Sequence, residues 1–336
     1  MKVFKFGGAS INSVERIQNV GKIIASYPGE KLLIIISAMG KTTNALEKVA
    51  ESFFAGDQTQ SLELFTQVKE THRQTLKYLC TLGWKESEDH LKEFFTEVEW
   101  LLHDQPVRTF DYYYDQIVCS GELMSTAMVS HYLNENKVRN KWVDVRDIIR
   151  TDDNFRDAGI QWEATAANVA DKVAPLFELY DVVITQGFIG STDENESTTL
   201  GREGSDYSAA IFANLLGAES VTIWKDVDAV MSADPKKYPE AAVIPNLSFT
   251  EVIEMAYYGA QVIHPKTIKP LQNKKIPLLV KSFIDPSLPG THIGEKQPKQ
   301  LPPIIVDKPN QVLMQFRTKD FSFIEEAPME ALHELF

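Results

Sequence analysis

Apolar positions near the start of the chain alternate between short buried runs and an amphipathic stretch. Residues 2–6 are expected to form a strand, and residues 31–37 (KLLIIIS) form an apolar run typical of a strand buried on both faces. Between them, residues 14–24 carry apolar side chains at helical spacing, and Asn12 and Glu15 have the spacing of a capping box. Strand, helix and strand in this order predict a βαβ unit and therefore a parallel sheet with a right-handed crossover.

After the second strand, the apolar pattern predicts long helices, and further along the chain predicted strands and helices alternate again. Residues 57–104 are rich in Glu, Lys and Leu, contain one glycine and no proline, and predict a helical insertion. The polar, acidic stretch 191–197 predicts a hairpin or a flexible loop. Further helices are predicted at 108–132, 207–216, 248–258 and 265–273, and further strands at 142–145, 181–185, 221–224 and 276–282. The predicted fold class is therefore α/β with an open, mainly parallel sheet.

The last part of the chain has a different composition. Residues 286–303 are rich in Pro, Gly and Lys and are interpreted as a linker. One strand-like run, 311–317, and one amphipathic helix, 321–336, follow. Because a single strand and helix cannot bury a core of their own, this tail either docks on the main domain or begins a further one.

The composition of the chain argues against some classes of partner and location. The chain has 336 residues, 43% of them hydrophobic and 24% charged, which is ordinary for a soluble globular protein of one large or two medium domains. A formal net charge of −13 argues against nucleic acid and anionic membranes as partners. The start of the chain resembles a strand and not a signal peptide, and no apolar run reaches the length of a membrane span. A cytoplasmic location is therefore expected.

Metal and common nucleotide motifs are absent from the sequence. Two cysteines, Cys80 and Cys119, cannot form a disulfide framework or a zinc site and are expected to be buried thiols. The seven histidines have no metal-binding spacing, so no resident metal site is predicted. Residues 40–42 (GKT) do not belong to a P-loop, because Ile35 stands where that motif needs glycine.

Two glycine-rich segments could carry chemistry. In KFGGAS, residues 5–10, Lys5 ends a strand and two glycines precede a helix, which suits a phosphate site; an ordinary glycine turn with a solvated lysine is the alternative. In GREGSD, residues 201–206, Ser205 has the position of an N-cap and Asp206 lies in the first turn, which could be a plain cap. Arg202 adds a guanidinium that can hold a carboxylate with two hydrogen bonds.

Three more segments are ambiguous when taken singly. Residues 224–236 place three carboxylates and two lysines around a turn, as in a nucleotide-ribose site or a solvated hairpin. The hydroxyl-rich run 37–44 and an inward-facing Glu122 suit an amino-acid ligand with its ammonium group, although each alone is more often structural.

In this order the motifs resemble the aspartokinase branch of the amino acid kinase family. The resemblance covers about residues 1–285 and rests on KFGGAS at 5–10, SAMGKTTN at 37–44, GE at 121–122, GFIG at 187–190, GREGSD at 201–206, IWKDVDAVMSADP at 223–235 and YGAQVIHP at 258–265. It implies a three-layer α/β/α sandwich, with an aspartate lobe over about 1–200 and an ATP lobe over about 201–285. It also implies transfer of the ATP γ-phosphoryl group to the β-carboxylate of L-aspartate, with Mg²⁺, as the first step of lysine, threonine and methionine biosynthesis.

The resemblance also assigns roles to individual residues. The catalytic residues would be Lys5 and Asp206. The amino acid would be bound by Ser37, Thr43, Glu122, Phe188, Arg202 and Ser205. ATP would be bound by Lys5, Gly7, Gly8, Ser10, Lys225, Asp226, Met231, Lys236 and Gln261.

The sequence departs from the family pattern at several of these motifs. Glu203 stands where the family usually has glycine, and Gln261 stands where some members have a phosphate-binding lysine. Ala9, Lys225, Met231 and Lys236 also differ from the usual residues. Another kinase of the same fold, acting on glutamate, acetylglutamate or a nucleotide, and a catalytically weak amino-acid sensor are the alternative functions.

Residues 304–336 concern the regulation of the protein. Aspartokinases usually end in paired ACT domains that bind inhibitory amino acids and often build a homodimer. Residues 304–336 resemble the opening of such a module, and the chain stops inside it. The resemblance therefore predicts a partial ACT-like segment, little feedback inhibition, and a homodimer for the intact protein.

Overall fold

The computed structural model describes residues 1–260, 262–296, 301–307 and 312. Contacts divide the chain into Met1–Val306 and Asp307–Phe336, and everything below concerns the first of these units. The strand expected over 311–317 and the helix expected over 321–336 lie outside the described residues, apart from Val312.

The described residues form an eight-stranded sheet in the order β3-β4-β2-β1-β7-β9-β10-β8. The strands are β1 Lys2–Phe6, β2 Leu32–Ile36, β3 Asn140–Trp142, β4 Val182–Gln186, β7 Ser220–Lys225, β8 Asn246–Ser248, β9 Leu278–Ser282 and β10 Thr291–Gly294. The first six strands in the sheet order are parallel, while β10 is antiparallel to β9 and parallel to β8. The predicted open, mainly parallel sheet is confirmed.

The register of the central strands brings their carboxyl ends to one edge. Phe6 of β1 pairs with Ile36 of β2 and with Trp224 of β7, and Ile36 pairs with Gln186 of β4. All five residues of β2 are buried, as the uninterrupted apolar run predicts for a strand covered on both faces. Side chains that follow these strands therefore converge at the same edge of the sheet.

Helices cover the sheet on two faces. They are α1 Val14–Ala25, α2 Thr42–Phe54, α3 Gln58–Leu79, α4 Trp84–His103, α5 Phe110–Glu135, α6 Trp162–Asn168, α7 Gly204–Leu216, α8 Phe249–Tyr257 and α9 Pro265–Lys274. From β1 the chain crosses through α1 to β2 on one side, whereas from β4 it crosses through α7 to β7 on the other side of β1. With right-handed crossovers, α1 and α7 lie on opposite faces, which gives the three layers.

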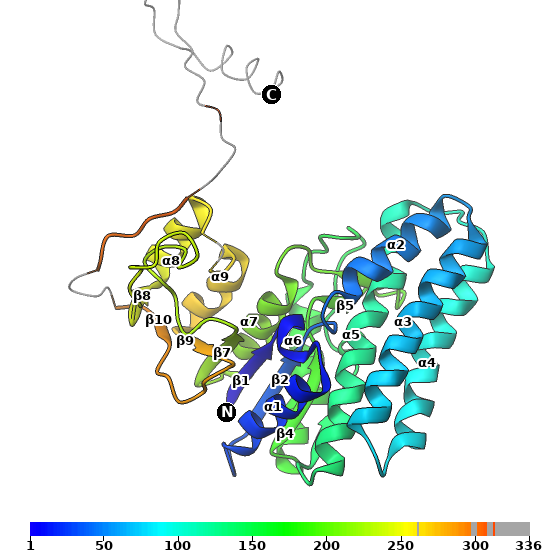
Figure 1. Cartoon of the computed structure of the whole chain (residues 1–336), viewed down its shortest axis with the longest axis horizontal. Helices are drawn as coiled ribbons and strands as arrows, with labels where there is room; N and C mark the ends of the chain where they lie inside the picture. Colours follow the sequence, from blue (N-terminus) through cyan, green and yellow to red (C-terminus); the bar gives the residue numbers. More distant parts are fainter. Residues whose placement is uncertain (261, 297–300, 308–311, 313–336) are drawn as a thin grey trace, which may run out of the picture. The chain divides into compact units, whose positions relative to one another are not determined.

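The helical insertion predicted over 57–104 is α3 and α4, which turn at Gly83. Figure 1 shows α2, α3, α4 and α5 side by side as a bundle at one end of the sheet. Residues 191–197 join β5 (Ile189–Ser191) to β6 (Ser197–Thr199), so the hairpin and not the flexible loop is correct. Both cysteines are buried and free. Among the described helices, none combines the length and the apolar character needed to cross a membrane.

Three local predictions are corrected. The α1 helix is capped by the Ser13 hydroxyl, which accepts from the Arg16 N–H, and not by Asn12. The α7 helix begins at Gly204, so Ser205 lies inside the first turn and is not the cap. The third strand ends at Trp142 rather than extending to residue 145.

The stretch interpreted as a linker over 286–303 contains a strand of the main sheet. Gly290, with φ of 72°, turns the chain into β10, and Thr291 and Ile293 are fully buried beside β9. The many Pro, Gly and Lys residues around this four-residue strand hide it from a composition argument. The compact unit accordingly extends to Val306.

Candidate active site

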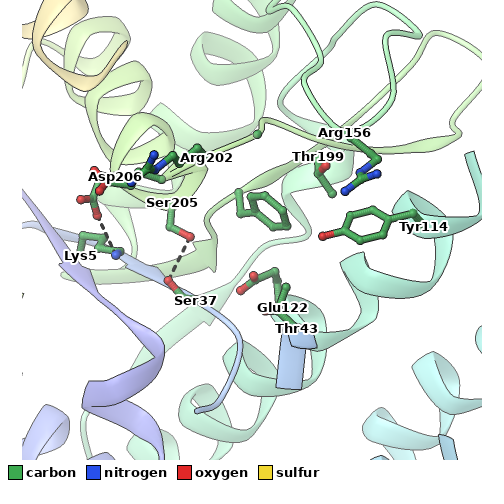
Figure 2. Close-up of a pocket in the computed structure, with 14 residues that line it drawn as sticks. Lys5, Ser37, Thr43, Tyr114, Glu122, Arg156, Thr199, Arg202, Ser205 and Asp206 are labelled. Atoms are coloured by element: carbon green, nitrogen blue, oxygen red, sulfur yellow. Dashed lines mark hydrogen bonds and ion pairs between the residues drawn. The ribbon is translucent and has the colours of Figure 1, made fainter. Parts of the chain in front are cut away.

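A cavity of about 440 Å³ opens where the carboxyl ends of β1 and β2 meet α5 and α7 (Figure 2). Eight residues predicted from the sequence lie in its wall: Lys5, Ser37, Thr43, Glu122, Phe188, Arg202, Ser205 and Asp206. They come from segments up to about two hundred positions apart in the sequence, so the parallel register of the sheet is what brings them together.

Lys5 and Asp206 form a nearly buried ion pair in this wall. Lys5 Nζ lies 2.7 Å from Asp206 Oδ1, and the two side chains are 13% and 4% exposed. The contact is an ion pair rather than a hydrogen bond of good geometry, because Asp206 Oδ1 has no hydrogen-bond partner among the described residues. An ammonium has three N–H donors, so Lys5 can hold Asp206 and still bind an anionic ligand.

Two serines join the two sides of the cavity. Ser37 Oγ, at the end of β2, donates to Ser205 Oγ at 3.0 Å. Gly187 permits this approach, since a Cβ at that position would lie 2.6 Å from Ser205 Cβ. The backbone N–H of Phe188 donates to Ser208 Oγ on α7 at 3.0 Å, which fixes the turn after β4 against this helix.

Glu122 is a buried carboxylate without an adequate partner. It lies on α5, is 3% exposed, and its Oε2 has no hydrogen-bond partner within the described part of the chain. Burial raises the Glu122 pKa from 4.5 to about 8, and the positive charge of Lys5 and the Ala38 N–H only partly oppose this shift. A buried acceptor of this kind favours a cationic ligand, because an ammonium would supply both the missing hydrogen bonds and the missing charge.

Glu203 takes a backbone conformation that explains the glycine of the family pattern. Its φ of 53° lies in the left-handed region, where glycine is least strained. The Glu203 carboxylate accepts a hydrogen bond from the His264 N–H at 2.9 Å, at the first residue before α9. Its negative charge therefore faces a helix N-terminus, where it is stabilised, besides lining the cavity.

The far end of the cavity was not predicted. Tyr114, Arg156 and Thr199 line it, and Figure 2 shows them on the side away from Lys5. The Arg156 guanidinium lies 4.4 Å from the centre of the Tyr114 ring. Buried Asp115 holds this wall, since it accepts from the Arg156 N–H at 3.0 Å and from the N–H and hydroxyl of Thr199, each at 2.8 Å.

Burial also raises the pKa of Asp115, from 3.8 to about 6, although its hydrogen bonds to Arg156 and Thr199 favour the charged form. A sequence signal for this residue did exist. Asp115 precedes Glu122 by seven positions, two helical turns, so both carboxylates fall on the same side of a helix. Arg156 gave no such signal, because it follows the sheet in an irregular loop.

Of the residues predicted to bind ATP that the structure describes, only Lys5 lines the cavity. Gly8 packs close to the next turn, where a Cβ would lie 2.6 Å from the Ala38 carbonyl oxygen, and the adjacent Gly7 precedes it in the same loop. Ser10 is buried and donates its N–H to the Gly7 carbonyl. The loop thus has the close backbone packing expected of the motif, while its contact with phosphate stays a prediction.

The other predicted nucleotide residues lie around the end of β7. Lys225 Nζ donates to the Val262 carbonyl, and Asp226 forms an ion pair with Arg16. Met231 pairs with Val243 in an isolated bridge, and Lys236 is exposed. Gln261 lies outside the described residues. Their role in binding ATP stays a prediction.

The sequence model of the amino acid kinase family matches residues 1–282. The chain belongs to the amino acid kinase family. This match covers every strand of the sheet except β10 and every residue that lines the cavity. The family resemblance expected from the sequence motifs is confirmed.

Within the amino acid kinase family, the chain is similar to aspartokinases. It is 37% identical over 300 residues to aspartokinase 2, chloroplastic, of Arabidopsis thaliana, covering 87% of this chain and 54% of that protein. It is 34% identical over 294 residues to the lysine-sensitive aspartokinase 3 of Escherichia coli (strain K12), covering 88% of this chain and 64% of that protein. The chain thus spans little more than half the length of the first of these relatives.

Solved structures show the same relation. E. coli aspartokinase III in complex with lysine and aspartate (T-state) matches with a TM-score of 0.80 at 33% identity, over 89% of this chain and 66% of that one. The same enzyme in complex with aspartate and ADP (R-state) matches with a TM-score of 0.78 at 34% identity, over 89% of this chain and 65% of that one. The three-layer fold of this amino acid kinase family member is therefore that of aspartokinases.

Proposed function

We propose that this chain is an aspartate kinase, which transfers the γ-phosphoryl group of ATP to the β-carboxylate of L-aspartate. One observation carries the proposal: the buried carboxylate of Glu122, whose Oε2 has no hydrogen-bond partner among the described residues, shares a small cavity with Arg202 and with the Lys5–Asp206 ion pair. An amino acid with a second carboxylate offers a complementary group for each of these. The similarity to aspartokinases supports the choice of aspartate.

The substrate would be held at both of its α groups. Glu122 would accept hydrogen bonds from the α-ammonium, which would also neutralise the carboxylate. Arg202 would bind the α-carboxylate with two hydrogen bonds, since its guanidinium has no ion-pair partner among the described residues. The β-carboxylate would then point toward Lys5.

The chemistry requires charge neutralisation more than a base. A β-carboxylate is ionised near pH 7, so it is already nucleophilic. The barrier comes from bringing two anions together, and positioning plus electrostatic stabilisation lowers it. Lys5 would bind the transferred phosphoryl group, and Asp206 would keep the Lys5 ammonium charged and oriented. Because the acyl phosphate product hydrolyses in water, the site must exclude water during the reaction.

Magnesium fits this site as part of the substrate MgATP. Within the described ranges, no group of three His, Cys, Asp or Glu side chains could hold a resident metal ion. Mg²⁺ commonly binds through phosphates, waters and one or two carboxylates, and Asp206 is a carboxylate available beside the phosphoryl position. When bound, the ion would offset the negative charge of the phosphates.

The direct test is ADP release by the purified chain with MgATP. We expect turnover that depends on L-aspartate and is not supported by L-glutamate or N-acetyl-L-glutamate. Turnover with one of these other acceptors alone would keep the kinase and replace the substrate. Binding of aspartate and ATP without any turnover would replace the kinase by an amino-acid sensor.

A further inference from the structure

The loop that leads into α7 is bonded to the start of α9 by a side chain that the family's usual glycine lacks. Glu203 lines the cavity, is half-buried, and its carboxylate accepts a hydrogen bond from the His264 N–H at 2.9 Å, across 61 positions of sequence. The loop and the first turn of α7 contain Arg202, Ser205 and Asp206, which line the same cavity. The contact therefore joins the cavity wall to a helix that contributes no residue to that wall among those described.

The backbone conformation of Glu203 is not one that a residue at this position adopts for local reasons. Its φ of 53° and ψ of 28° are left-handed, which is unfavourable for a residue with a Cβ and not for glycine. A left-handed residue commonly ends a helix, as Lys137 and Lys275 do after α5 and α9. The residue before a helix usually has an extended backbone instead. The distant contact of the Glu203 carboxylate therefore helps to stabilise a turn that its own residue type disfavours.

The first backbone donors of α9 are all accounted for, so the bond to Glu203 is specific. Pro265, at the first helical position, has no N–H to donate. The Lys266 N–H donates to the His264 side chain at 3.2 Å, and the Thr267 N–H donates to the His264 carbonyl at 2.9 Å. The His264 N–H is therefore the donor that remains, and the Glu203 carboxylate is its acceptor.

A second contact connects the cavity wall to the same helix. Asp157 forms an ion pair with Lys266 in the first turn of α9. The Asp157 carboxylate also lies against Gly201, so close that a Cβ on this glycine would collide with it. Residue 156, directly before this aspartate, is the arginine at the far end of the cavity. Both segments whose arginines line the cavity, at Arg156 and Arg202, are thus bonded to the start of α9.

The segment just before α9 is bonded in turn to the end of β7, where ATP is predicted to bind. Lys225 Nζ donates to the Val262 carbonyl oxygen. Lys225 is one of the residues predicted to bind ATP, and Val262 directly follows another, Gln261. The bond from Glu203 to His264 and the bond from Lys225 to Val262 therefore meet in one short piece of backbone. Two sites that share an ordered segment can change each other's affinity, because the cost of ordering it is met only once.

We propose that Glu203 is a positioning residue that couples the aspartate site to the nucleotide site. When aspartate orders the loop 201–206, the Glu203 carboxylate also orders the segment 262–266 beside the nucleotide. The inference rests on the proposed function, because aspartate and ATP are the two ligands. Each ligand binds more tightly in the presence of the other, and by the same factor, as linkage requires. A chain with glycine at this position keeps both sites and loses the contact that joins them.

The coupling is measured as the affinity for MgADP with and without saturating L-aspartate. Calorimetry on the purified chain gives both dissociation constants, and ADP is used because it cannot turn over. We expect MgADP to bind at least about five-fold more tightly when L-aspartate is present, which is within the usual range for coupled sites. Equal affinities would overturn the coupling and leave the proposed kinase intact. A chain that binds neither ligand would overturn the proposed function, and the coupling with it.

Three variants assign the coupling to the hydrogen bond. Glu203→Gly removes the acceptor and relaxes the left-handed backbone, so the ratio of the two affinities should fall to about one. Glu203→Gln keeps an oxygen that can accept from the His264 N–H and should keep most of the coupling. Lys137→Gly relaxes a similar backbone, with φ of 65°, at an exposed residue outside the cavity and should leave the coupling unchanged. Coupling that persists in Glu203→Gly, or that is lost in either of the other two variants, would contradict the proposal.

Amide hydrogen exchange tests the contact itself in the ligand-free chain. The His264 N–H should exchange at least about ten-fold more slowly in the unaltered chain and in Glu203→Gln than in Glu203→Gly, because a hydrogen-bonded amide must open before it exchanges. This readout needs no turnover and no ligand, so it is independent of the proposed reaction. Equal exchange rates in the three proteins would show that the bond does not hold the loop, and the positioning role of Glu203 would be excluded.

Discussion

At the residue scale, the cavity contains two buried carboxylates in opposite electrostatic situations. Asp206 has the ammonium of Lys5 at 2.7 Å, whereas Glu122 has a free oxygen and a pKa raised to about 8. Desolvation is therefore the dominant effect on the Glu122 pKa, and a cation supplied by a ligand would lower this pKa again. This difference gives a measurable proton exchange on binding.

Aspartate binding near pH 7 should release about one proton from the chain, since a group with a pKa of about 8 is mostly protonated there and must ionise to pair with an ammonium. Calorimetry in buffers of different ionisation enthalpy measures this number. The release should fall toward zero above the Glu122 pKa, and in Glu122→Gln at any pH. A proton count that is unchanged in Glu122→Gln would assign the release to another group.

The same shift predicts how pH affects the ligand-free protein. The folded state holds the Glu122 proton more tightly than the unfolded state does, with a pKa of about 8 against 4.5. Its contribution to stability is therefore complete below about pH 4.5 and is lost as the pH rises through about 8. Denaturant unfolding measures the free energy of unfolding of the chain and of Glu122→Gln as a function of pH. The two proteins should differ most in how steeply this free energy falls between about pH 4.5 and pH 8, and parallel pH profiles would contradict the raised pKa.

Lys5 and Arg202 should affect different kinetic constants. Lys5→Ala should lower kcat by at least about a hundred-fold, because it removes charge stabilisation of the transferred phosphoryl group. Arg202→Ala should mainly raise the KM for aspartate, by about ten-fold or more, because it removes a contact to a group that does not react. Steady-state rates decide this, and a Lys5→Ala enzyme with unchanged kcat would exclude Lys5 from the phosphoryl site.

At the scale of elements, one side chain joins two helices of the insertion. Glu135, at the end of α5, accepts hydrogen bonds from the N–H groups of Thr81, Leu82 and Gly83, just before α4 begins. Its partial burial raises the pKa, but these hydrogen bonds outweigh that effect and lower it to about 2. The turn between α3 and α4 is thus held by a carboxylate from a third helix.

Glu135→Ala should lower the free energy of unfolding by about 1–3 kcal/mol, because three backbone donors lose their acceptor. Chemical denaturation at neutral pH measures the loss. The contribution should be present above about pH 4.5 and disappear as the pH falls through about 2, where the folded carboxylate is protonated. Glu63→Ala, at an exposed glutamate of α3, is the control, and an equal loss there would remove the capping explanation.

Elements with a strong apolar pattern could be predicted from the sequence, and those defined by tertiary contacts could not. The apolar run 31–37 and the helical insertion were recognisable because their burial repeats along the chain. The strand Thr291–Gly294 was missed because only two of its side chains are fully buried and its neighbours resemble a loop. Ser205 was misplaced because the left-handed turn at Glu203 shifts the helix start by two residues.

The candidate site divides in the same way. Residues within recognisable motifs, such as Lys5 and Arg202, were predicted and lie in the cavity. Arg156 was missed because it lies in a loop whose path follows no local pattern, whereas Asp115 was missed although it lies two turns before Glu122 on the same helix. Side chains that would bind the substrate could therefore be predicted from sequence motifs, whereas the side chains that stabilise the far end of the cavity were missed.

At the scale of the whole molecule, β1 lies where the direction of strand addition reverses, with β2 on one side and β7 on the other. Ligands bind at such positions in open α/β sheets, because the helices on the two faces diverge there. Lys5 lies on this strand, next to its end. The location of the cavity therefore follows from the topology, while its charge pattern follows from a few residues.

The edge of the sheet formed by β10 and β8 determines how far the folded domain extends along the chain. The strand β10 is the neighbour of β8 and separates it from β9. The Thr291 hydroxyl donates to the Ile244 carbonyl at 2.6 Å and accepts from the Val230 N–H at 2.8 Å, so β10 also fixes the segment between β7 and β8. That segment contains three of the residues predicted to bind ATP, Asp226, Met231 and Lys236.

A chain ending at Asp285 should therefore be less stable than one ending at Val306. The shorter chain loses β10, leaves β8 without its partner strand, and exposes the edge of β9 to association with other chains. We expect a lower thermal midpoint by circular dichroism and a greater tendency to aggregate, while the chain ending at Val306 unfolds in one cooperative step. Equal midpoints for the two chains would show that β10 contributes little, and that the domain ends where the sequence alone suggested.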